Sequence, residues 1–139
     1  ADGRTAEDLA VLATVDAALV TVTDQIERVE LRAALRTGMD GAAAVNAYLN
    51  ATEPWKLAKT DPERARVVLG TALAAVAGVR VALSPYLPFT TLALEDVFGP
   101  IDAWERVEPT PGTPVSKPTP LYAKVDLDEL LAGQPPTDQ

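Results

Sequence analysis

The chain has 139 residues, the length of one ordinary domain, and 47% of them are apolar, enough to build a core. It contains no cysteine and no histidine, which excludes disulfides, cysteine nucleophiles, Cys/His zinc sites and the usual general base near neutral pH. Twelve basic and 20 acidic residues give a net charge of −8, so we expect no DNA binding and, with RNA, only local contacts.

Apolar residues spaced three and four apart predict two amphipathic helices in the first half of the chain. The first helix covers residues 6–27 and begins after Thr5, an acceptable N-cap. Its predicted apolar stripe consists of Leu9, Leu12, Val15, Leu19, Val22 and Ile26. The second helix covers residues 30–52 and ends near Pro54, because a proline disfavours helix at the residue before it. Its stripe begins with Leu31 and Leu35, and Gly38 and Gly41 permit a kink in its middle.

A third helix is predicted over residues 61–84, and its start fits two registers. Thr60 and Glu63 match a capping box, whereas Asp61 can act as the cap with a proline at the first helical position. This helix is apolar almost throughout, and only thirteen residues separate its two interior arginines, Arg66 and Arg80. A membrane span needs about 20 apolar residues. We therefore expect a buried central helix and no membrane contact.

A short fourth helix is predicted over residues 89–98, with Gly99 as its C-terminal stop. Four helices with short connections, and no strand pattern before residue 100, predict an all-α fold: an antiparallel four-helix bundle over residues 1–99. Residues 100–139 hold 8 of the 12 prolines. This high proline content predicts a proline-rich, extended C-terminal tail that is ordered only where another surface holds it.

No catalytic constellation is visible in the sequence. There is no glycine-rich phosphate loop, and the carboxylates are scattered without the spacing of metal ligands. Asp126, Asp128 and Glu129 cluster in the tail, where a solvated surface or a helix start explains them better than a metal does. We predict no catalytic residue, metal site or cofactor in this chain.

One segment at the end of the second helix suggests binding. Asn46 and Asn50 precede a corner formed by Pro54 and Trp55, and two lysines follow, Lys56 and Lys59. The proline fixes the chain direction, and an exposed indole can stack on a nucleobase, which is worth about 1–3 kcal/mol per base. The lysines can meet phosphates and the amides can read base edges. The alternative is that Trp55 anchors the core between the second and third helices, and composition alone favours that alternative.

Three segments of the chain, taken in order, resemble the anticodon-binding helical bundle of class I methionyl-tRNA synthetases. The first segment is similar to the Asn-x-Tyr helix, the Pro-Trp corner and the Leu-x-Lys stretch of that family, which here are Asn46-Ala47-Tyr48, Pro54-Trp55 and Leu57-Ala58-Lys59. The run from Leu83 to Thr90 resembles the entry to its fourth helix. The run from Gly112 to Tyr122 resembles its Lys-Pro-x-Pro-Leu-Phe ending, with Tyr122 in place of phenylalanine.

The resemblance implies a role in attaching methionine to its tRNA with ATP. It implies that Trp55 helps to recognise the CAU anticodon near the wobble base. The implied partners are the tRNA for methionine and a catalytic domain, absent from this chain, that binds ATP and methionine. The implied location is the cytoplasm, which the lack of cysteine fits. An Asn and an Arg that the family uses on the helix leading into the bundle would fall before Ala1, and no HIGH-like or KMSKS-like signature is present.

A second hypothesis is that the chain is a synthetase-derived helical scaffold or interaction domain that no longer binds tRNA. The acidic charge balance agrees with this hypothesis. Under the first hypothesis, the isolated chain should have no aminoacylation activity and should bind methionine tRNA weakly at best.

Overall fold

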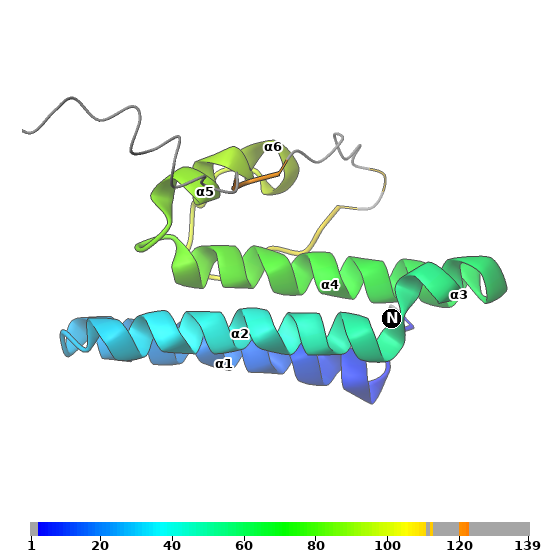
Figure 1. Ribbon diagram of the computed structural model, residues 1–139, viewed down its shortest axis with the longest axis horizontal. Helices are drawn as coiled ribbons and strands as arrows, with labels where there is room; N and C mark the ends of the chain where they lie inside the picture. The colour runs from blue at the N-terminus through cyan, green and yellow to red at the C-terminus, as the bar shows by residue number, and fades with distance from the viewer. Residues whose placement is uncertain (1–2, 111, 113–119, 123–139) are drawn as a thin grey trace, which may run out of the picture.

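The computed structural model describes residues 3–110, 112 and 120–122, and every regular element within these residues is a helix. Three helices of 22 residues each lie side by side and form the body of the molecule (Figure 1). They are α1 (Ala6–Glu27), α2 (Leu31–Thr52) and α4 (Pro62–Leu83), and successive long helices run antiparallel. The structure confirms an all-α bundle, with the predicted boundaries of these three helices correct to within a residue.

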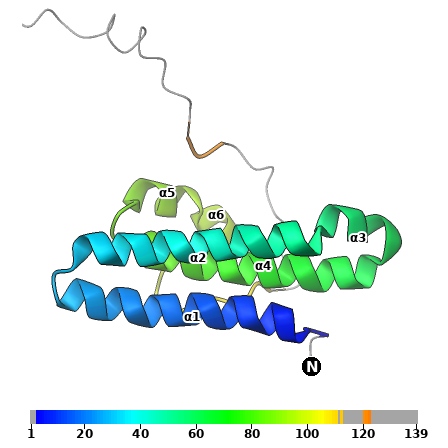
Figure 2. The same ribbon diagram turned by 60° about the horizontal axis from the view of Figure 1, so that its bottom comes forward.

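Three short helices complete the described fold. At one end of the body, α3 (Pro54–Thr60) joins α2 to α4. The other two, α5 (Pro88–Ala93) and α6 (Glu95–Phe98), lie on the side of α4 that faces away from α1 (Figures 1 and 2). The sequence missed α3 and predicted one helix over 89–98. That helix is interrupted at Leu94, whose backbone conformation (φ −98°, ψ 1°) ends one helical segment before the next begins.

The prediction of a buried central helix is confirmed, because α4 packs against α1, α2, α3 and α5 and has more buried residues than either of the other long helices. Its fully enclosed side chains are small, and Val68, Thr71, Ala74 and Ala75 are all 0% exposed. By length and composition alone, α1 and α4 are both apolar enough to cross a membrane. Their environments differ, because 61% of the apolar stretch of α4 is buried inside the bundle, compared with 28% for α1.

Two glycines allow the long helices to approach one another closely. A Cβ atom on Gly78 would lie 2.4 Å from Cγ1 of Val15 on α1, and one on Gly38 would lie 2.6 Å from Cδ2 of Leu83 on α4. The kink that Gly38 permits in the second helix does not break it, since α2 runs continuously from Leu31 to Thr52. These glycines therefore serve packing between helices rather than a change of direction.

Part of each predicted apolar stripe is wrong. Leu9 is 55% exposed, and Leu31 and Leu35 are also exposed. On α1 the buried face begins with Asp8 and Val11 instead. The reason is that hydrogen bonds from Tyr48 and Arg64, described below, satisfy the carboxylate of Asp8, so that an ionised residue occupies the position where the pattern favoured leucine.

Arg80 fastens α5 and α6 to the bundle. Although it is only 6% exposed, its Nε donates to the carbonyl of Thr91 over 3.1 Å and its Nη1 donates to the carbonyl of Gly99 over 2.8 Å. The guanidinium also lies over the ring of Phe98, 6.0 Å from the ring centre. Burial lowers the pKa of Arg80 from its ordinary value.

The first part of the predicted tail, residues 100–110, has no helix and lies against the bundle. Trp104 Nε1 donates to the carbonyl of Leu19 over 3.1 Å, and Arg106 Nε donates to Asp16 Oδ1 over 3.0 Å. Further along, the hydroxyl of Tyr122 lies 2.6 Å from that of Thr90 on α5. Most of the predicted tail, including Asp126, Asp128, Glu129 and much of the Gly112–Tyr122 motif, lies outside the described residues.

Candidate nucleic-acid interface

The corner between α2 and α4 is built from three local signals in the sequence. Glu53 ends α2 with a left-handed backbone (φ 43°, ψ 57°), which is unusual for a residue other than glycine and turns the chain sharply. Pro54 then occupies the first position of α3 and is buried. At the far end of α3, the side chain of Asp61 accepts a hydrogen bond from the backbone N–H of Arg64 over 3.0 Å, which settles the register in favour of the Asp61 cap.

Trp55 lies on the outer surface of this corner. The side chains that pack inward are Pro54, which is buried, and Leu57, which contacts the hydrophobic core. Trp55 itself is 55% exposed. The hypothesis that it anchors the core is therefore wrong, and a substantial part of the indole is open to a ligand.

Lys56 and Lys59 are exposed on the same outer arc of α3 as Trp55, since Trp55 and Lys59 are four residues apart and Leu57 faces the core. They differ in their partners. The ammonium of Lys56 forms an ion pair with the carboxylate of Glu53, at 2.7 Å from Oε1. Among the described residues Lys59 has no ion-pair partner, so it is the cation more readily available to an anionic ligand.

Asn46 and Asn50 are both exposed, and they lie one helical turn apart on the last turns of α2. The structure thus brings all six predicted site residues to the end of the bundle that α3 caps (Figure 1). Five of them are open to solvent, and the sixth, Pro54, supports the corner from inside.

Beneath this corner is a buried polar cluster that the sequence analysis missed. Asp8 is 0% exposed and accepts four hydrogen bonds, from Arg64 Nη1 at 2.5 Å, from Arg64 Nη2 at 2.8 Å, from the Tyr48 hydroxyl at 2.5 Å and from the backbone N–H of Thr5 at 2.8 Å. The cluster joins the start of α1, the end of α2 and the start of α4. The aromatic anchor of the corner is therefore Tyr48, from the Asn-x-Tyr motif, and not Trp55.

The protonation of the cluster follows from these contacts. Burial by itself would raise the pKa of the Asp8 carboxyl, but the hydrogen bonds from Arg64, Tyr48 and the Thr5 backbone outweigh burial and hold that pKa well below its usual range. Burial and the neighbouring Asp8 carboxylate raise the pKa of Tyr48 above its usual value. Asp8 is ionised and Tyr48 is a neutral donor at neutral pH, so the cluster is a fixed structural joint.

One signal in the sequence pointed to Asp8. It precedes Leu12, Val15 and Leu19 at the spacing of the apolar stripe, so it occupies a core position. Its partners Tyr48 and Arg64 lie 40 and 56 residues away, and no local pattern connects them to it. Within the described residues, no group of three or more acidic side chains is arranged to hold a metal ion.

The geometry therefore defines a helical bundle with a rigidly mounted, open aromatic corner and a basic side chain beside it. Residues 1–132 match the family described as the anticodon binding domain of methionyl tRNA ligase. The chain belongs to this family.

Curated relatives agree with this assignment. The chain is 36% identical to a methionine–tRNA ligase of Nocardioides sp., over 92% of the chain and 27% of the relative. It is 31% identical to that of Thermobifida fusca, over 90% and 27%, and 33% identical to that of Roseiflexus sp., over 91% and 26%. The chain thus spans about a quarter of the length of these relatives.

Proposed function

We propose that this domain recognises the CAU anticodon of methionine tRNA, as one module of a methionine–tRNA ligase. The observation that carries the proposal is the open indole of Trp55 on a short helix that the core holds in place, in a member of an anticodon-binding family. Stacking tolerates any base but needs an accessible aromatic face, and the 55% exposure of Trp55 supports this role.

Each remaining site residue has a distinct role in the proposal. Lys59 contacts a backbone phosphate first. Lys56 then contacts a phosphate by giving up its ion pair with Glu53, which as a surface ion pair contributes about 1 kcal/mol or less. Asn46 and Asn50 hydrogen-bond to base edges. Pro54 and the Asp8 cluster hold the corner in position and do not touch the RNA.

In this proposal the chain is one part of a larger enzyme, which agrees with its covering about a quarter of the length of its curated relatives. Residues 1–99 form the recognition bundle and residues 100–139 an extension of it. The remainder of the longer ligase supplies a catalytic domain that binds ATP and methionine, so this chain needs no cofactor of its own. Such an enzyme works in the cytoplasm with free tRNA, and neither DNA nor a membrane is its partner.

The second hypothesis, a scaffold that has lost RNA binding, draws on the net charge of −8 and on the neutralisation of Lys56 by Glu53. It makes the opposite prediction about Trp55. A scaffold would show no difference between RNAs with different anticodons, and the loss of the indole would change nothing in RNA binding.

Binding of anticodon stem-loop RNAs to the chain at low salt tests the proposal. The probes are one stem-loop with CAU and one with GAU in the same frame. We expect weak binding that favours CAU, and we expect Trp55→Ala to weaken it by about 5- to 150-fold, the equivalent of one lost base stack. The matched control is Trp104→Phe, at the other tryptophan, which should leave RNA binding unchanged. Equal binding of both RNAs by the wild type and by Trp55→Ala would refute the proposal.

A further inference from the structure

One row of residues runs along nearly the whole exposed side of α2. Its members recur at alternating steps of four and three, which keeps them on one face of the helix. Every member is exposed and none is acidic. Because the chain as a whole carries a net charge of −8, a surface of this length without a carboxylate is one that an anionic polymer can approach. This α2 row consists of Arg32, Arg36, Met39, Ala43, Asn46 and Asn50.

The two arginines of the α2 row differ from most basic side chains of the protein, because no carboxylate neutralises them. Arg80 is buried, and most other basic residues that the structure describes form ion pairs. Within the described residues, the exposed cations without an ion pair are Arg32, Arg36 and Lys59. The paired residues are Arg4, Arg28, Lys56, Arg64, Arg66 and Arg106.

The α2 row leads from the arginines to the candidate interface. Helix α2 runs from its turn with α1 to the corner that α3 forms (Figures 1 and 2). At about 1.5 Å per residue, Arg36 lies about 21 Å and Arg32 about 27 Å along the helix axis from Asn50. A stacked strand advances about 3.4 Å per nucleotide, so these distances correspond to about six to eight nucleotides. The three bases of an anticodon bound at the corner would not reach the arginines, whereas the RNA that flanks them would.

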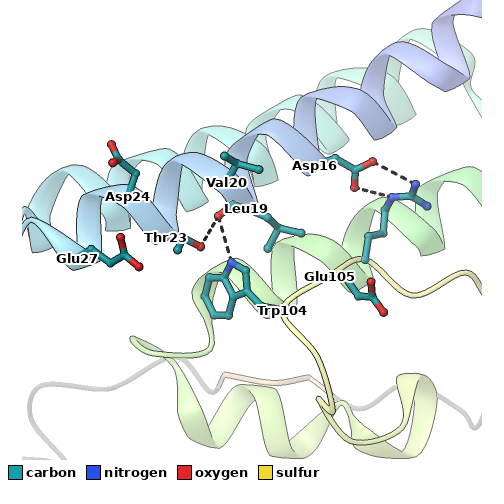
Figure 3. A pocket seen from close by; sticks show the side chains of 9 residues that line it. Asp16, Leu19, Val20, Thr23, Asp24, Glu27, Trp104 and Glu105 are labelled. Carbon is teal, nitrogen blue, oxygen red and sulfur yellow. Dashed lines mark hydrogen bonds and ion pairs between the residues drawn. The ribbon is translucent and has the colours of Figure 1, made fainter.

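The α1 side of the bundle is acidic by comparison. A groove of about 640 Å³ opens there between α1 and residues 104–106 (Figure 3). The single guanidinium in the groove, that of Arg106, already pairs with Asp16. The groove is therefore negative on balance, and its field repels phosphate and favours α2 as the path of an RNA. The charged residues that line it are Asp16, Asp24, Glu27, Glu105 and Arg106.

The middle of the α2 row is uncharged. Ala43 has no side chain beyond its Cβ atom, and Met39, which is 52% exposed, is flexible. Neither residue repels a phosphate backbone that passes over it. The one acidic residue of α2, Asp40, is displaced from Met39 by about 100° around the helix axis and so lies beside the row.

We propose that the α2 row binds the sugar-phosphate backbone of the double-stranded stem that adjoins the anticodon loop. Arg36 and Arg32 contact phosphates of the stem, while Asn50 and the Trp55 corner contact the loop. The proposal rests on the anticodon function proposed above and extends it from the bases to the paired stem. Phosphate contacts fix the orientation of a nucleic acid on a protein but carry no sequence information. The arginines therefore supply affinity and orientation, and the corner selects the anticodon.

The salt dependence of RNA binding tests the proposal. The probes are the CAU stem-loop and a single-stranded RNA of seven nucleotides with the sequence of its loop. For the double variant Arg32→Gln, Arg36→Gln, we expect the slope of log K against log salt to flatten by about one for each arginine with the stem-loop. Binding of the single strand should be unchanged. The matched control is Arg66→Gln on α4, an exposed arginine already paired with Glu63, which should alter neither RNA.

The anticodon provides a readout that separates this proposal from the proposed function. The double variant should lose the same affinity for the CAU and GAU stem-loops, because phosphates are common to both. An unchanged slope with the stem-loop, or an equal loss with the single strand, would overturn the contact with the stem and leave anticodon recognition standing. Equal binding of CAU and GAU by the wild type, with the slope still flattened in the double variant, would refute anticodon recognition and support the contact with the stem.

A tethered cleavage reagent locates the stem directly, and the chain is suited to it because it has no cysteine of its own. Cysteine replaces one exposed residue at a time, in Met39→Cys on the α2 row, Ala58→Cys on α3 and, as control, Ala17→Cys on α1. Each variant carries an iron–EDTA reagent that cuts nearby RNA backbone. We expect Met39→Cys to cut the stem and Ala58→Cys to cut the loop, with Ala17→Cys at background. Cuts by Met39→Cys that are confined to the loop, or no stronger than those of Ala17→Cys, would overturn the placement of the stem on α2.

Discussion

Replacing Asp8 by asparagine removes the negative charge of the buried side chain that joins α1, α2 and α4. The variant keeps the size of the side chain but leaves the guanidinium of Arg64, whose side chain is 23% exposed, without its carboxylate. Breaking a buried ion pair by removing one partner costs about 3–5 kcal/mol, and the partial exposure of Arg64 places this case near the lower end. For a domain of this size, a loss of about 3 kcal/mol lowers the melting temperature by roughly 10 °C.

The control is Glu63→Gln, in an ion pair with Arg66 whose two side chains are 81% and 75% exposed. Exposed pairs contribute about 1 kcal/mol or less, so this variant should melt within a few degrees of the wild type. Melting followed by far-ultraviolet circular dichroism at pH 7 measures both. Equal shifts for Asp8→Asn and Glu63→Gln would refute the conclusion that the Asp8 cluster holds the bundle together.

The acid range provides an independent measurement of the same cluster. The folded-state pKa of Asp8 is lowered, so its ionisation stabilises the fold fully above the unfolded pKa of about 4, and this stability is lost as the pH falls through the folded pKa. The melting temperature of the wild type should therefore decline more steeply below pH 4 than that of Asp8→Asn. Parallel curves for the two proteins would show that Asp8 is not the group responsible.

Three further predictions concern packing and attachment. Gly78→Ala should destabilise the fold by about 1–3 kcal/mol, because the new methyl would meet Val15. Gly70→Ala should stabilise the fold by about 0.5–1 kcal/mol, because the new methyl has nothing within 4 Å. Urea unfolding compares the two variants. Trp55→Ala should cost about 1 kcal/mol, well below the 3–5 kcal/mol of an aromatic core residue, and a larger loss in urea unfolding would place the indole in the core after all. Arg80→Met should speed amide hydrogen exchange in α5 and α6, because it removes the hydrogen bonds to Thr91 and Gly99, and should leave exchange in α1 unchanged. Unchanged exchange in α5 and α6 would show that Arg80 does not hold these two helices in place.

The helices that the sequence predicted well are those whose ends are marked by strong local signals. Pro62 and the Asp61 cap define the start of α4, and Pro54 ends α2. The same proline explains why α3 was missed. A proline followed by tryptophan was interpreted as a corner, but proline is also favoured at the first position of a helix, and Glu53 makes the turn one residue earlier.

The faces of the helices were harder to predict than their ends, because long-range partners decide them. Leu9 matched the stripe but lies outside, whereas Asp8 has the spacing of the stripe, is charged and lies inside, since Tyr48 and Arg64 satisfy it. The exposure of Trp55 could not be predicted for the same reason. Whether an indole beside a proline packs inward depends on which neighbour fills the core, and here Tyr48 does so.

Three helices of 22 residues, at 1.5 Å per residue, each extend about 33 Å, so the length of one helix is nearly the length of the body. Gly78 and Gly38 let Val15 and Leu83 pack directly against the backbone of the neighbouring helix. Sliding one helix along another would press these side chains against residues that have a Cβ atom. The distance between the Trp55 corner and the turn between α1 and α2 is therefore fixed by the number of residues per helix. Inserting or deleting a helical turn would change that spacing by about 5.4 Å, and every contact at one end would then be out of step with the other.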